Sequence, residues 1–309
     1  MGKRLTITDY LIALLVVFLV FCMIVAFFYG VHVGKTQAEQ KYEPLLKYQL
    51  HTSAFDDEQT AYHQQHLVSF YYNVYYPFRT FQTSWTKTMM DIHTGQETDA
   101  RAAIKKMSST AAEVYHSIET MTIPEKSPLL QHAQTNYLRS LRLFQEADAR
   151  LSNYSGPVRH AVQEFLDDPF IADAVGYALT AQAQFYEAIV KWHQSITEEE
   201  LQGADRLHDI EMELAAWSEL PFNIQNSIVA QAMLEHRIFA NYTPQDLTAV
   251  LEAMIDSGNA ETLGWHNVTE AVKLLNDTNA VRSDDYFTYK DAYFRDEIMP
   301  QLPFYNEPQ

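Results

Sequence analysis

The most pronounced pattern in the chain is an unbroken apolar segment near the N-terminus. Between Tyr10 and Val33 there is no Asp, Glu, Lys or Arg, and nearly every residue is Leu, Val, Ile, Phe, Ala or Met. A helix of this length rises about 36 Å, which exceeds the roughly 30 Å thickness of a bilayer's hydrocarbon core. The pattern therefore predicts a transmembrane helix at residues 10–33, with the lipid bilayer as a direct partner.

A cleaved signal peptide and a buried soluble helix both fit this segment less well. A signal peptide has a shorter apolar core, of about 7–15 residues, and a small-residue cleavage site, whereas this run continues to Val31-His32-Val33. A helix buried inside a soluble protein is rarely apolar on every side over such a length. We expect an uncleaved anchor with a short tail at residues 1–9 inside the cell and a polar stalk at residues 34–55. The C-terminal part then lies outside the cytoplasm, because long domains translocate largely regardless of charge.

Residues 56–196 carry apolar positions that recur every three or four residues, the spacing of one face of a helix. There are four such stripes, at Leu67–Trp85, Ile104–Met121, Leu130–Leu151 and Ile171–Ile196. Chain breakers separate them: Gly95, Pro124, Pro128, Gly156, Pro157 and Pro169. Because short connections make successive helices antiparallel, we predict an all-α fold whose main part is an antiparallel four-helix bundle. Pro77 interrupts the first stripe and predicts a kink there.

Residues 197–309 show shorter helix patterns and more acidic residues. Thr197 and Glu200 have the spacing of a capping box and predict a helix that ends near Leu220. Further helix starts are predicted at Pro221 (extending to about Tyr242), Thr243-Pro244, Asn267 and Ser283. From Ala204 onward there are 18 acidic and 6 basic residues. This acidic C-terminal helical region is either a second small domain or a cap packed on the bundle.

Composition excludes several functional classes. Nine glycines in 309 residues are too few for the glycine-rich phosphate loops of nucleotide-binding folds. The formal net charge of −18 opposes nucleic-acid binding, because phosphate contacts require clustered Lys and Arg. The motifs of serine hydrolases, zinc proteases and P-loop enzymes are also missing from the sequence. We therefore expect no nucleic-acid partner, no cofactor and no enzymatic activity.

Two pairs of residues are candidate metal ligands. Glu113 and His116 have the spacing at which di-iron bundle proteins place two ligands on one helix face. His63 and His66 have the same spacing and could share a metal with Glu58 or Asp57. A complete site needs more ligands than either pair supplies. Solvated helix surface is therefore the simpler interpretation of both pairs.

Aromatic residues crowd the helix around Pro77. Five of them are candidates for lining a ligand pocket beside the predicted kink: Tyr71, Tyr75, Phe78, Phe81 and Trp85. Apolar clefts between bundle helices that also carry a few hydroxyl groups are common binding sites. The alternative is that these rings simply form the core and the contact with the C-terminal helices.

The leading functional hypothesis follows from the anchor, the helical ectodomain and the missing catalytic motifs. It is a single-pass membrane protein whose extracytoplasmic helical domain acts as a non-enzymatic interaction, scaffold or assembly protein of the cell envelope. A sensory bundle that binds a small molecule near Pro77 is the first alternative. A metal-dependent bundle enzyme is the second.

Overall fold

A computed structural model describes residues 62–96, 99–151, 165–166, 168–197 and 200–306. The predicted tail, transmembrane helix and stalk (residues 1–55) lie outside the described residues. No helix in the described ranges has both the length and the apolar character that crossing a membrane requires. The residues from Thr60 to Gln309 form one compact unit.

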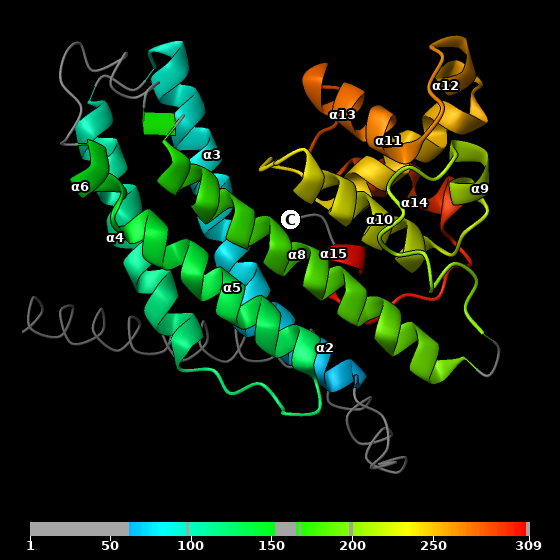
Figure 1. Ribbon diagram of the computed structural model, residues 1–309, viewed down its shortest axis with the longest axis horizontal. Helices are drawn as coiled ribbons and strands as arrows, with labels where there is room; N and C mark the ends of the chain where they lie inside the picture. The colour runs from blue at the N-terminus through cyan, green and yellow to red at the C-terminus, as the bar shows by residue number, and fades with distance from the viewer. Residues whose placement is uncertain (1–61, 97–98, 152–164, 167, 198–199, 307–309) are drawn as a thin grey trace, which may run out of the picture. The chain divides into compact units, whose positions relative to one another are not determined.

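The expected all-α class is confirmed for the described residues, which contain helices and turns but no strand. A single pair of these residues, Glu213 and Asn267, forms an isolated antiparallel bridge. The first group of helices is α2 (Gln64–Phe70), the π-helix η1 (Tyr71–Tyr75), α3 (Tyr76–Thr94), α4 (Ala100–Glu119), α5 (Pro128–Gln145), α6 (Ala147–Leu151) and α8 (Pro169–Ile196). These helices form the expected bundle, in which α5 packs between α4 and α8 (Figure 1).

The ends of the bundle helices follow local sequence chemistry. Gly95 terminates α3 in the left-handed conformation (φ 76°), which glycine adopts without steric cost. Asp99 caps α4 by accepting a hydrogen bond from the Ala102 N–H, and Asp168 caps α8 through the Phe170 N–H. Proline opens both α5 and α8. These boundaries agree with the breaks predicted from the sequence, while Gly156 and Pro157 lie outside the described residues.

Pro77 is accommodated by a change of helix type just before it. The five residues of η1 are π-helical, and the Tyr76 N–H donates to the Tyr71 carbonyl, five residues back. The chain then continues into α3 without a break. Single π-helical turns inside α-helices are rare, and both π-turns and prolines are recognised sites of helix bending.

The apolar stripes of the four helices meet in one core. Phe78 of α3 packs on Tyr137 of α5 with ring centroids 4.3 Å apart, and Trp85 packs on Phe144 at 4.5 Å. Tyr75 packs on Phe185 of α8 at 4.8 Å. The periodicity of the sequence therefore identified residues that are buried in the interior.

The helix predicted from Thr197 to Leu220 is wrong. The described residues 200–213 form successive turns, and the only helix among the described residues 200–220 is the short α9 (Leu214–Ser218). The Thr197 hydroxyl donates back to the His193 carbonyl at the end of α8, so it does not cap a new helix. Gly203 has a positive φ of 79° and lies so close to Leu220 that a Cβ would be 2.7 Å from a leucine methyl carbon. Tertiary packing of this segment outweighs its helical pattern.

The remaining helices are α10 (Phe222–Glu235), α11 (Pro244–Asp256), α12 (Asn259–Thr262), α13 (Val268–Asp277), α14 (Asp285–Tyr293) and α15 (Pro303–Asn306). The starts of α11 and α13 agree with the predicted caps at Thr243 and Asn267. The second predicted helix ends at Glu235 and does not reach Tyr242. The chain reverses there through Arg237, whose φ is 53°.

The C-terminal helices pack directly on the bundle. In Figure 1, α8 lies between α5 on one side and α10 on the other, and α10 packs along α8. Four large side chains of this region belong to the same buried cluster as the bundle core: Phe222, Tyr286, Phe304 and Tyr305. A second apolar cluster lies among α9, α10, α11 and α13. The C-terminal helices therefore cap the bundle within the single unit from Thr60 to Gln309.

Candidate functional site

The two predicted metal pairs acquire no third ligand within the described residues. Glu113 and His116 are exposed on α4, and His116 Nδ1 lies 3.6 Å from the Glu119 carboxylate. The rings of His63 and His66 are 5.2 Å apart, and His66 Nδ1 lies 3.1 Å from the Ser127 hydroxyl. No cluster of three or more His, Cys, Asp or Glu side chains with metal-binding geometry occurs in the described part of the chain.

The five aromatic residues proposed to line a pocket near Pro77 are packed against other rings. Each has an exposed fraction of at most 3%. Tyr71 and Tyr75 both contact Phe304 of α15, at 5.4 and 5.7 Å between ring centroids. Burial raises the pKa of both phenols, so they stay neutral. This packing favours a structural role for the rings, and a ligand pocket beside Pro77 stays a prediction.

A buried polar layer joins α3 to the start of α11. Arg79 donates to the carbonyls of Ala240 and Asn241, each at 3.1 Å, and Gln82 donates to Ala240 at 3.0 Å. Arg79 is only 6% exposed. Buried polar groups need hydrogen-bond partners, and the turn before α11 supplies them here. This layer holds the C-terminal helices on the bundle.

Asp246 completes the same layer. Its carboxylate accepts hydrogen bonds from the Thr243 N–H (2.8 Å), the Thr243 hydroxyl (2.7 Å) and the Tyr286 N–H (3.1 Å). Burial raises the pKa of this carboxyl group, while those hydrogen bonds and the charge of Arg79 act in the opposite direction. The carboxylate joins the starts of α11 and α14, which is a structural task.

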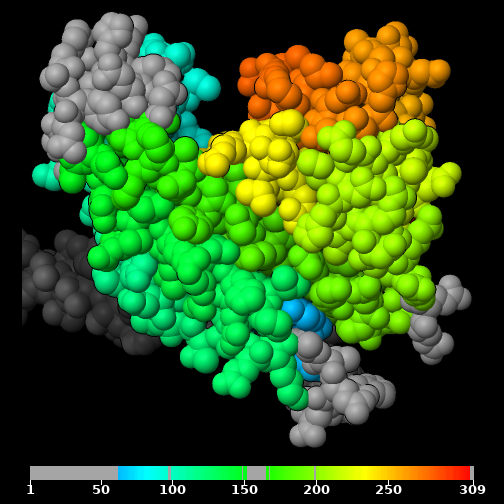
Figure 2. All heavy atoms as spheres, in the orientation of Figure 1, coloured from blue at the N-terminus to red at the C-terminus, as the bar shows by residue number. Residues whose placement is uncertain are grey.

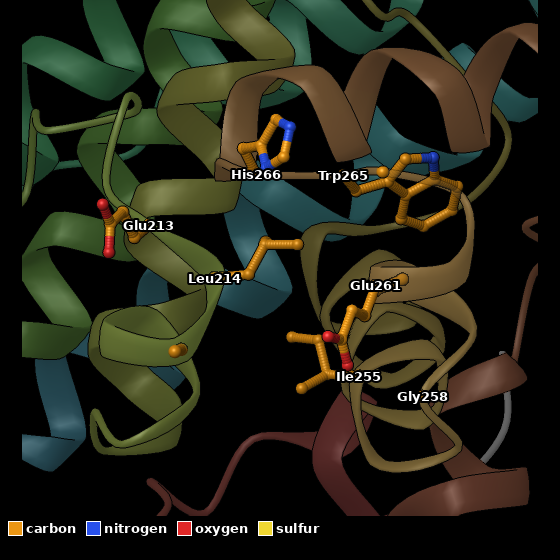
Figure 3. Close-up of a pocket in the computed structure, with 10 residues that line it drawn as sticks. Glu213, Leu214, Ile255, Gly258, Glu261, Trp265 and His266 are labelled. Carbon is orange, nitrogen blue, oxygen red and sulfur yellow. The ribbon is translucent and has the colours of Figure 1, made fainter.

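A pocket among the C-terminal helices has a volume of about 560 Å³ and lies beside α9 and α12. Its lining contains two glutamates, one histidine and one tryptophan, but no Lys or Arg among the described residues: Glu213, Glu261, His266 and Trp265. In Figure 3, the side chains of Leu214 on α9 and Ile255 on α11 project toward the space between these two helices, whereas Glu213 projects from the other side of its backbone. The polar side chains thus do not converge on one point, as an acid–base pair would require.

A second depression, of about 430 Å³, crosses the outer face of α5. Its lining residues come from three helices: Tyr115 of α4; Thr135, Leu138, Arg139, Arg142 and Leu143 of α5; and Tyr177 of α8. We call these residues the α5 groove. Leu138 and Leu143 are half-buried and form its apolar part, while both arginines are exposed. The α4–α5 hairpin forms part of the surface that faces the viewer in Figure 2.

The two arginines of the α5 groove have no acidic partner among the described residues. None of the Asp and Glu side chains that the structure describes forms an ion pair with either guanidinium, although Glu113, Glu146 and Asp173 lie on the neighbouring helices or turn. Arg139 lies over the Tyr177 ring, 5.6 Å from its centroid. A tyrosine face orients a guanidinium without neutralising it, so both charges stay available for a ligand.

The sequence contained one sign of this groove that periodicity does not reveal. The segment 128–145 contains two arginines and one histidine but no Asp or Glu. Residues 100–150 carry 7 basic and 5 acidic residues, in a chain whose net charge is −18. The contribution of Tyr177 could not be inferred, because only folding brings α8 beside α5.

No protein-family model, curated protein or solved structure matches this chain.

Proposed function

We propose that this chain is a single-pass membrane-anchored protein of the cell envelope that binds a protein partner outside the cytoplasm and performs no catalysis. The α5 groove is the observation that supports partner binding. It combines exposed arginines with tyrosines and half-buried leucines from three helices in one depression. Arginine and tyrosine are enriched in the energetically dominant residues of protein interfaces, where apolar contacts surround them.

The apolar segment at residues 10–33 supports the proposed localisation at the membrane. Its length and composition are those of a spanning helix. A tether concentrates the helical unit near other envelope proteins, so that a groove of modest size suffices for a transient interaction. Scaffold and assembly proteins need both a fixed location at the membrane and a surface that binds a partner.

Site-specific photo-crosslinking in intact membranes tests the proposed partner. A photoreactive residue in place of Thr135 stands inside the α5 groove, and the same residue in place of Thr288, exposed on α14, is the matched control. We expect a discrete protein adduct from position 135 and none from position 288. Equal labelling from both positions, or no adduct from position 135 in native membranes, contradicts the proposal.

The membrane orientation has its own test. Replacing Cys22, the only cysteine, by alanine and introducing a cysteine at position 288 leaves one reporter thiol on the helical unit. A membrane-impermeant maleimide should label this thiol in intact cells as completely as in lysed cells. Labelling that appears only after lysis would place the unit in the cytoplasm and end the extracytoplasmic part of the proposal.

The pocket in Figure 3 favours one alternative function, the binding of a small molecule. Its volume of about 560 Å³ falls in the range of small-molecule sites. A ligand present at a hundred times its dissociation constant stabilises the folded state by about 2.7 kcal/mol. A thermal-shift screen with wild type and an Ala215→Trp variant, designed to fill the pocket, tests this alternative. A compound that stabilises the wild type but not the variant would support it.

A further inference from the structure

We infer that the α5 groove binds an acidic peptide segment that carries a branched apolar side chain. This inference rests on the proposed function, because it specifies the chemistry of the partner. The groove presents two guanidinium groups one helical turn apart, Arg139 and Arg142, next to an apolar strip. An occupant that matches both features needs carboxylates and an aliphatic group together.

Charge complementarity identifies the acidic part of the occupant. The α4–α5 hairpin has more basic than acidic residues, and α5 itself has no Asp or Glu. Neither groove arginine forms an ion pair with a described acidic residue. The carboxylate of Glu119 on α4 accepts a hydrogen bond from the Tyr115 hydroxyl at 3.3 Å, and it forms no ion pair with either groove arginine. Carboxylates of a partner would form charge-assisted, bidentate hydrogen bonds with the two guanidinium groups.

The apolar part of the groove distinguishes a peptide from a simple anion. Leu138 and Leu143 remain partly exposed and line the same depression as Tyr115 of α4 and Tyr177 of α8. An inorganic anion would use only the arginines and would leave the leucines in contact with water. A peptide with an aliphatic side chain covers both leucines, and this burial adds a hydrophobic contribution to the ionic one. A nucleic acid is disfavoured, because the remainder of the chain is strongly acidic.

Fluorescence anisotropy with full-length protein in a nonionic detergent tests the inference. The probe is a short fluorescein-labelled peptide that repeats Glu-Glu-Leu. Two matched peptides repeat Gln-Gln-Leu, which lacks the charge, and Glu-Glu-Gly, which lacks the aliphatic side chain. We expect saturable binding of the first peptide, and binding at least about tenfold weaker for each of the others, since each loses one of the two contributions.

Variants locate the binding site. The double variant Arg139→Gln/Arg142→Gln should weaken binding of the Glu-Glu-Leu peptide by about tenfold or more. The matched control Arg282→Gln/Arg295→Gln removes the same charge from exposed positions in the C-terminal region and should leave binding unchanged. Thr135→Glu places a negative charge in the groove and should weaken binding, whereas Thr135→Gln should not.

Three results would overturn the inference. Equal binding of the Gln-Gln-Leu peptide would show that charge is irrelevant, and equal loss in both arginine double variants would show nonspecific attraction. Full competition by inorganic phosphate or by a short-chain anionic lipid at equal concentration would identify a general anion site. The proposed function fails separately: a Thr135 adduct in membranes without peptide binding refutes only the acidic-peptide chemistry. Peptide binding without a membrane adduct refutes only the partner protein.

Discussion

Two regions of this protein combine arginine with aromatic rings and use them in opposite ways. On the inner side of the bundle, Arg79 follows Phe78 on α3 and donates to the carbonyls of Ala240 and Asn241. On the outer side, Arg139 and Arg142 lie beside Tyr115 and Tyr177, exposed and without an acidic partner among the described residues. The same residue types therefore hold the fold together in one place and are available to a partner in the other.

The difference lies in burial and in hydrogen-bond partners. Arg79 is almost inaccessible, so each of its donors must be satisfied within the protein. The outer arginines are solvated and lose little by remaining unpaired until a ligand binds. The same substitution, arginine to methionine, at Arg79 and at Arg139 therefore separates a structural role from a role in partner binding.

The largest effect is expected for Phe78→Ala. The Phe78 ring is buried and packs on Tyr137, so truncation removes apolar contacts and leaves a cavity. We expect a loss of about 3–5 kcal/mol in the free energy of unfolding, measured by urea denaturation. Tyr177→Ala on the outer face is the control and should cost far less. A loss below about 1 kcal/mol for Phe78→Ala would mean that the ring faces an open space, as the pocket hypothesis near Pro77 requires.

A smaller but substantial effect is expected for Arg79→Met. Methionine fills much of the same volume but leaves the Asn241 carbonyl without its buried donor. The expected loss is about 2–3 kcal/mol in the free energy of unfolding. If the variant unfolds at the same urea concentration as the wild type, the buried layer does not hold the C-terminal helices on the bundle.

The third prediction concerns pH and Asp246. Burial raises the pKa of this carboxyl group in the folded state. Between the unfolded-state value of about 4 and that raised value, the folded protein holds a proton that the unfolded chain lacks. The contribution of Asp246 to the free energy of unfolding therefore increases as the pH falls through the folded-state pKa. This contribution is lost as the pH rises through that pKa.

The Asp246 prediction is measured as a difference between proteins, because burial also raises the pKa of Glu252 and Glu297. Urea denaturation between about pH 4 and pH 7 should show a steeper fall in stability with rising pH for wild type than for Asp246→Asn. Asp296→Asn, at an exposed position, controls for the loss of one negative charge. Parallel pH profiles for wild type and Asp246→Asn would contradict the assignment.

The smallest effect is expected for Arg139→Met, the same substitution as at Arg79 but on the outer face. Exposed side chains away from caps and buried networks usually change stability by less than about 0.5 kcal/mol. Urea denaturation should therefore give nearly the wild-type midpoint, while Glu-Glu-Leu peptide binding weakens. A loss comparable to that of Arg79→Met would mean that Arg139 is structural and would remove half of the proposed anion-binding pair.

Local patterns in the sequence predicted most of the helices. The apolar stripes of α3, α4, α5 and α8, the helix start at Pro169 and the caps at Thr243 and Asn267 depend on residues within a few positions of one another. The same approach failed at Thr197 and at the end of α10. After Thr197, Gly203 packs closely against Leu220, and beyond the end of α10 the Arg237 guanidinium donates to the Ala172 carbonyl of α8; both contacts join residues that single-helix periodicity does not relate.

The candidate site was less predictable than the fold. Glu113, His116, His63 and His66 attracted attention because of their spacing on single helices, yet no further ligand joins them among the described residues. The α5 groove combines residues from positions 115 to 177, and single-helix spacing cannot reveal such a group. Its sign in the sequence was a stretch from Pro128 to Gln145 without acidic residues.

By itself, then, the amino-acid order determined the helical character of the described unit and the residues that line its interior, because both depend on short-range periodicity and on hydrophobic burial. Only the tertiary structure decided which arginines are enclosed and which face outward. It also decided that the C-terminal helices cap the bundle. The physical reason is that the neighbours of a guanidinium group decide its role. Folding places carbonyls, carboxylates or rings beside it, and these determine whether it stabilises the fold or remains free to bind a partner.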